Sequence, residues 1–139
     1  MISPPMARRF ALLLPLLALA GCTPAGNTGV DTGKFKGDAK AVAQTLDSLS
    51  SAARSKDGKK ACTQLLSRAV VSSLGPNCEK VMNNQFDDAD TFKLDVLSIA
   101  VRGDRATARV RSDVNGTKRV TALPLVREGG SWRVDRLSG

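Results

Sequence analysis

The feature that most constrains the fold is a change in the spacing of apolar residues near residue 91. Before it, Val42, Leu46, Leu49 and Ala53 recur every three or four positions, which predicts an amphipathic helix. After it, from Phe92 onward, apolar and polar residues alternate, which predicts β-strands. Helices followed by strands predict an α+β domain, with the N-terminal helices packed on a curved antiparallel sheet.

Short breaks divide the helical half of the chain. We expect Asp38 to cap a first helix over residues 39–56, because an Asp side chain accepts hydrogen bonds from the free N–H groups of a first turn. A second helix is expected over residues 61–66 and a third over residues 67–74, where Gly-Pro ends it. Asn77 is then expected to cap a further turn.

The second half predicts four strands in an antiparallel meander, over residues 92–101, 106–111, 118–127 and 131–137. The phase of the alternation reverses near residue 96, so we expect a β-bulge there. Pro124 lies in the third strand and has no N–H to donate. It therefore predicts an edge position or a bulge at that point.

Composition favours one small globular domain and gives little support to catalysis. The chain has 139 residues, of which 42% are hydrophobic and 24% charged, as is usual for a folded domain. It has no His and no Tyr. The commonest general base and the commonest metal ligand are therefore missing, so an enzyme is less favoured than a binding protein and no cofactor is expected.

The formal net charge of +8 is spread along the chain rather than gathered in one motif. Nucleic-acid binding is not expected, because four Phe and one Trp do not supply stacking aromatics among the basic residues. Two interpretations remain open. The charge attracts anionic lipid headgroups or wall polymers, or it is a solubilising surface with an Arg bias.

The N-terminus predicts an export signal. Arg8 and Arg9 precede an apolar stretch over residues 10–20, and Met1 and Met6 are both candidate start residues. Eleven apolar residues are too few to span a bilayer, which takes about 20. They suit the hydrophobic region of a signal peptide.

The four residues after that stretch, Leu19-Ala20-Gly21-Cys22, resemble the lipobox of bacterial lipoproteins. The resemblance implies cleavage between Gly21 and Cys22 and a diacylglycerol on the Cys22 thiol. With a further acyl chain such as palmitate, this is a stable membrane anchor. An ordinary secretory signal with an incidental cysteine is the alternative. The expected organisation is a lipoprotein signal peptide over 1–21, a flexible tether over 22–37 and a domain over 38–139, held on the extracytoplasmic face of the cell membrane.

Two other cysteines, Cys62 and Cys78, form an even pair in a chain predicted to be exported. Oxidising surroundings favour a disulfide between them. Such a bond closes a loop of 15 residues and contributes about 3 kcal/mol in the chain-entropy model. A metal site would need more ligands than two thiols, and a redox site would want closer spacing.

Four segments together resemble the nuclear transport factor 2-like (NTF2-like) family: residues 38–42, 54–62, 101–108 and 125–135, the last ending Gly-Gly-Ser-Trp-Arg-Val-Asp. The chain is similar to exported, lipid-anchored members of high-GC Gram-positive bacteria. The resemblance implies a cone with a pocket between the long helix and the concave face of the sheet. Isomerases of the family hold an oxyanion with a Tyr hydroxyl, and because this chain has no Tyr, no catalytic residue is assigned.

Three residues are candidates for the pocket. Trp132 is expected to pack between the sheet and the helices. Arg109 and Arg111 either face the pocket and hold an anion or point outward from an exposed sheet face. Asp87, Asp88 and Asp90 either bind Ca²⁺ or act as acid and base, or form a solvated turn, and no calcium-loop spacing surrounds them.

The function that these patterns favour is a non-catalytic ligand-binding or accessory module of the cell envelope, anchored through Cys22. Its expected partners are membrane lipid, and a small apolar ligand or an envelope protein. A homodimer through the sheet face is a further expectation. Two alternatives stay open: a small pocket enzyme of the isomerase or dehydratase type, and a structural assembly partner.

Overall fold

The computed structural model describes residues 29–137 as an α+β body, which confirms the predicted fold class. The helical elements are α1 (Gly37–Ser55), α2 (Gly58–Lys60), the π-helical turn η1 (Ala61–Leu65), α3 (Arg68–Leu74), the 3₁₀ turn η2 (Gly75–Asn77) and α4 (Cys78–Asp87). The strands are β1 (Phe92–Arg102), β2 (Arg105–Val114), β3 (Thr117–Glu128) and β4 (Ser131–Val134).

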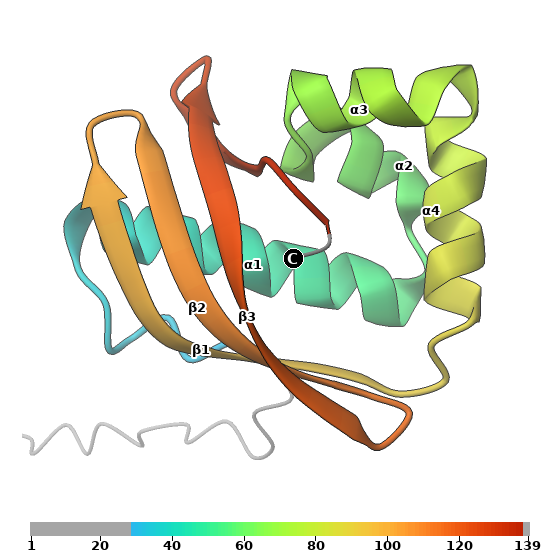
Figure 1. Cartoon of the computed structure of the whole chain (residues 1–139), viewed down its shortest axis with the longest axis horizontal. Coiled ribbons are helices and arrows are strands. Elements are labelled where there is room, and N and C mark those ends of the chain that lie inside the picture. The colour runs from blue at the N-terminus through green and yellow to red at the C-terminus, as the bar shows by residue number, and fades with distance from the viewer. Residues whose placement is uncertain (1–28, 138–139) are drawn as a thin grey trace, which may run out of the picture.

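The sheet is antiparallel in the order β1-β2-β3-β4, as the meander predicted. It curves around α1, which crosses its concave face, and the shorter helices gather at the C-terminal end of α1 (Figure 1). The core lies between α1 and the sheet. It includes Val42, Leu46, Val96, Val110, Leu125 and Val134, each at most 1% exposed.

The start of α1 differs from the sequence prediction. The capping position is Lys36, whose side chain makes no capping hydrogen bond. Asp38 lies inside the first turn, and its carboxylate instead pairs with the guanidinium of Arg127 at 2.8 Å. The prediction that Asp38 caps the helix is therefore wrong, because the helix begins at Gly37 and Asp38 lies two residues after the capping position.

The packed body begins before residue 38. Val30 is 8% exposed, and its N–H donates to the Asp47 carboxylate of α1 at 3.0 Å. Phe35 packs against the core as well. The described part of the predicted tether is therefore folded onto α1, and a chain starting at residue 22 retains every core residue that the structure describes. The predicted signal peptide, Gly21 and Cys22 lie outside the described residues.

Both irregularities predicted in the sheet have a structural counterpart. The register of β1 against β2 shifts between Val96 and Ser98, which confirms the bulge. Pro124 lies inside β3, at the place where β4 ends: the pairing with β4 stops at Leu125, and the Pro124 carbonyl accepts from the Asp135 N–H at 2.8 Å. From Thr117 to Pro124 that side of β3 has no strand beside it, so the missing N–H costs no ladder bond.

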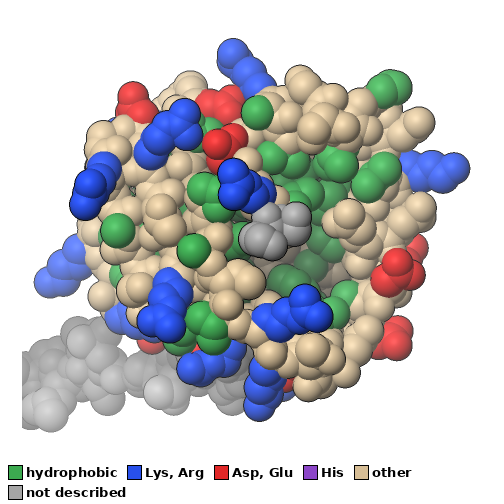
Figure 2. Space-filling view, in the orientation of Figure 1, with side chains coloured by type: hydrophobic (Ala, Val, Ile, Leu, Met, Phe, Trp, Pro, Cys, Tyr) green, Lys and Arg blue, Asp and Glu red, His purple; other side chains and the backbone are tan. Residues whose placement is uncertain are grey.

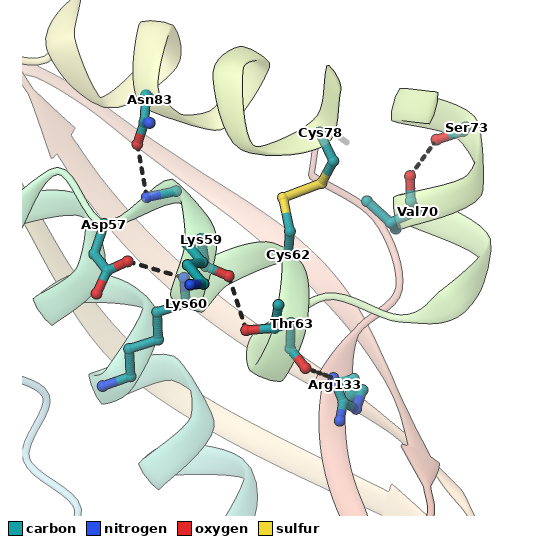
Figure 3. Close-up of a disulfide and its surroundings, with 11 residues drawn as sticks. Asp57, Lys59, Lys60, Cys62, Thr63, Val70, Ser73, Cys78, Asn83 and Arg133 are labelled. Carbon is teal, nitrogen blue, oxygen red and sulfur yellow. Dashed lines mark hydrogen bonds between the residues drawn. A yellow bond between two sulfur atoms is a disulfide. The ribbon is translucent and has the colours of Figure 1, made fainter. Parts of the chain in front are cut away.

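The predicted disulfide is confirmed. It joins Cys62 of η1 to Cys78, the first residue of α4, with Cα atoms 6.2 Å apart (Figure 3). Next to it, the Gly58 N–H donates to the Asn83 side chain at 2.7 Å. A Cβ at Gly58 would lie 2.6 Å from the Glu79 carbonyl, so only glycine lets α2 approach α4 this closely. These contacts hold α4 against the other helices. The helix is ten residues long, whereas the sequence predicted only a turn there.

Candidate ligand-binding cavity

A cavity of about 270 Å³ lies between the C-terminal half of α1, α4 and the sheet. In Figure 2 apolar side chains gather in a hollow between the sheet and the helices, with basic side chains on its margin. The lining comes from every layer of the fold: Leu49, Ala53, Met82, Gln85, Phe86, Ala89, Phe92, Leu94, Val110, Ser112, Val114, Thr121, Leu123, Val134, Arg136 and Leu137.

The cavity is apolar inside and carries few polar groups. Gln85, Ser112 and Thr121 are the uncharged polar members of its described lining, and Arg136 is the charged one. No carboxylate or thiol belongs to that lining. Apolar walls with a few polar groups are typical of sites that hold small molecules.

The cavity exists because β4 is short. It has four residues and pairs only with the Leu125–Glu128 end of β3. Beyond Val134 the chain leaves the sheet and passes between β3 and the helices (Figure 1). The uncovered part of β3, together with the start of β1 and the end of β2, therefore faces α4 across a space that no strand fills.

The three candidate pocket residues do not line this cavity. Trp132 is 4% exposed and lies in the core, with the Arg127 guanidinium 4.7 Å from its ring centre. Arg109 and Arg111 occupy alternate positions of β2, where Ala108 and Val110 are buried and the arginines exposed. Because alternate side chains point to opposite faces, both arginines lie on the outer face of the sheet.

The outer face accounts for these arginines without a pocket. Arg111 is paired across the strands with Asp95 at 3.5 Å. Arg109 borders a shallow depression with Val120 and Ala122, and Val120 is 48% exposed. The structure thus supports the outward-facing alternative for both side chains.

The acidic cluster forms the turn between α4 and β1. The Asp87 carboxylate pairs with Lys56 at 3.2 Å, and the Asp88 carbonyl accepts from the Asn115 side chain at 2.9 Å. Asp90 is exposed. Within residues 29–137 no three acidic or cysteine side chains are placed to hold a metal ion. The turn interpretation is the one that these contacts favour.

Sequence reasoning missed Gln85 and Arg136. The signal for Arg136 was present: Trp132 and Val134 alternate as inward-facing residues, and residue 136 continues that alternation. Gln85 had no such signal, because α4 was expected only as a turn. The same error hid Met82 and Phe86, which face the cavity from α4.

The segment that the structure describes contains no helix of the length and apolar character needed to cross a bilayer.

Comparison with known proteins supports the fold and goes no further. A designed NTF2-like protein, named Rd1NTF2_05 and carrying five substitutions, aligns with a TM-score of 0.52 at 14% identity, over 73% of this chain and 98% of its own. A de novo designed protein with a curved β-sheet aligns with a TM-score of 0.36 at 19% identity, over 42% of this chain and 55% of its own. No family model and no curated protein matches the chain. The fold is thus the NTF2-like α+β cone.

Proposed function

We propose that this chain is an extracytoplasmic lipoprotein, anchored to the cell membrane through an acylated Cys22, whose domain binds a small apolar ligand. The observation that carries the binding function is the cavity of about 270 Å³ between α1, α4 and the sheet, with its apolar walls. The lipobox-like Leu19-Ala20-Gly21-Cys22 supports the anchor.

The size and chemistry of the cavity suit binding. Its volume lies just below the range for small-molecule sites, about 300–1,000 Å³, so the ligand is a compact apolar group or a medium-length aliphatic chain. Leu49, Met82 and Phe86 supply apolar contact from the helices. An isomerase or dehydratase would need a general acid or base facing the ligand, and no carboxylate belongs to the described lining.

Binding is tested by filling the cavity. Ala53 lines it from α1, and Ala53→Leu adds three carbons to the space the ligand would take. The matched control is Ala122→Leu, the same change on the exposed outer face of β3. Native mass spectrometry of the two variants and the parent, each purified from the host, is expected to show an added small-molecule mass on the parent and the control, and less of it on Ala53→Leu. Equal loading of all three proteins, or no added mass on any, contradicts the proposal.

The anchor is tested separately. Cys22→Ala is expected to abolish incorporation of labelled palmitate and to move the protein from the membrane fraction to the soluble one, because acyl chains supply the attachment. Thr23→Ala, the next residue along, is the matched control and is expected to remain membrane-bound. Unchanged fractionation of Cys22→Ala would show that the attachment is not through this cysteine.

A further inference from the structure

A second hollow adjoins the mouth of the cavity. It lies between α3, α4 and the C-terminal segment, and its lining includes Ser73, Gln85, Asp135, Arg136 and Leu137. Three of these residues, Gln85, Arg136 and Leu137, also line the cavity. The two spaces therefore meet at a boundary with an apolar side chain on one side and a guanidinium and an amide on the other.

Arg136 differs from two other arginines of the described chain, Arg105 and Arg127, which both have an acidic partner. Arg105 pairs with Asp135 at 3.6 Å, and Arg127 pairs with Asp38 at 2.8 Å. Within residues 29–137, Arg136 has no ion pair and no side-chain hydrogen bond, and its side chain is exposed. A guanidinium that no side chain of residues 29–137 neutralises, placed at the opening of an apolar cavity, is available to an anion.

The one acidic member of the hollow does not cancel this charge. Asp135 lines it, but its side chain is 25% exposed and its carboxylate already pairs with Arg105 on β2. Gln85 lines the same two spaces as Arg136 and offers an amide N–H₂ group, so the two side chains supply several N–H donors to one region. Such donors suit an oxyanion, and a guanidinium recognises a carboxylate by paired hydrogen bonds.

We propose that the site takes a single-chain amphiphile, with its aliphatic chain in the cavity and a carboxylate head group in the adjoining hollow against Arg136 and Gln85. This proposal rests on the binding function proposed above and names the class of ligand. The volume of the cavity favours a medium-length chain over a two-chain lipid.

The test compares three ligands with the same decyl chain and different heads: decanoate, decanol and decyltrimethylammonium. The protein is the chain from residue 22 with Cys22→Ser, so that no acyl group competes for the cavity. Titration calorimetry measures their affinities for this parent, for Arg136→Gln and for Arg109→Gln. Arg109 is the matched control, because it is an exposed arginine on the outer face of the sheet, away from the cavity.

We expect Arg136→Gln to weaken decanoate binding about three- to fivefold at low ionic strength, the range expected of one exposed ion pair. The same substitution should leave the affinity for decanol unchanged and should not lower the affinity for decyltrimethylammonium. Arg109→Gln should change the affinity for none of the three ligands. If decanol binds but Arg136→Gln leaves decanoate unaffected, or weakens all three ligands equally, the head-group assignment is wrong and the binding function stands. If none of the ligands binds, or if Ala53→Leu leaves decanol binding intact, the binding function itself falls.

Discussion

The two ends of the space between α1 and the sheet are packed in different ways. At the N-terminal end of α1, Trp132 is 4% exposed, the Arg127 guanidinium lies over its ring, and Thr45 of α1 donates to the Trp132 carbonyl at 3.0 Å. At the other end Phe92 and Leu123 are only partly buried and border a cavity of about 270 Å³. We call these the closed end and the open end.

The difference lies in what completes each end. The closed end is completed by side chains of β3, β4 and the first turn of α1. The Arg127 guanidinium lies over the Trp132 ring and pairs with the Asp38 carboxylate. The open end is completed by α4, which the Cys62–Cys78 disulfide ties to η1 rather than to the sheet. A helix held by other helices leaves room in front of the sheet. The fold is thus secured at one end and hollow at the other.

The largest effect should come from emptying the closed end. Trp132→Ala removes a buried aromatic ring and should lower the free energy of unfolding by about 3–5 kcal/mol. Phe92→Ala removes a ring that is only partly buried and already borders empty space, so its cost should be less than half as large. Urea denaturation of both variants measures the two losses. Equal losses would mean that the ends are packed alike.

Next in size is the disulfide. Replacing both Cys62 and Cys78 by Ala should lower the free energy of unfolding by about 3 kcal/mol, because the unfolded chain is no longer cross-linked. Ligand affinity should fall too, since the bond positions α4, which supplies Met82 and Phe86 to the cavity. Reducing the parent with dithiothreitol is the control, and calorimetric melting should give the same midpoint as the double variant. A midpoint that reduction leaves unchanged would remove the disulfide from this explanation.

Most of the closed end follows from the sequence. Helical spacing on Val42 and Leu46 and strict alternation on β2 are short-range patterns, and they identify the two faces that meet in the core. The alternation also placed Trp132 between sheet and helices, where it lies. What the sequence did not show is the pairing of Asp38 with Arg127, which are 89 residues apart, because no local pattern joins them.

The open end was much harder to predict. The cavity depends on where β4 stops: the sequence predicted a strand to residue 137, but the pairing ends at Val134. It depends also on α4, whose polar residues conceal a face made by Cys78, Met82 and Phe86. Hydrophobic patterning shows which residues face inward, but it does not show whether their side chains fill the space between the elements. Arg109 and Arg111 were candidates because they are basic residues on a strand. They alternate with the buried residues of β2, so their side chains lie on the outer face of the sheet.

A smaller effect is expected at the ion pair of the closed end. Asp38→Asn should lower the free energy of unfolding by about 1 kcal/mol or less, because the Asp38 side chain is 58% exposed and water screens the attraction of its carboxylate to Arg127. Asp104→Asn is the matched control: Asp104 lies 4.0 Å from the same guanidinium and is 78% exposed, so its loss should be smaller still. The difference between the variants should shrink in high salt, as measured by thermal melting at two ionic strengths. A larger loss for Asp104→Asn would reverse the assignment.

Filling the cavity should have the opposite effect on the free energy of unfolding, and it compares the two ends most directly. Ala43 and Ala53 both lie on the buried face of α1, at the closed and the open end respectively. Ala53→Leu extends into the cavity and should raise the free energy of unfolding by about 0.5–1 kcal/mol, as filling a void does. Ala43→Leu has no such space and should lower it by about 1–3 kcal/mol through overpacking. Both variants replace Ala by Leu within the same helix, so the change in helix propensity is the same for both and does not explain a difference between them. Urea denaturation measures both, and destabilisation by both would mean that the open end has no room for a ligand.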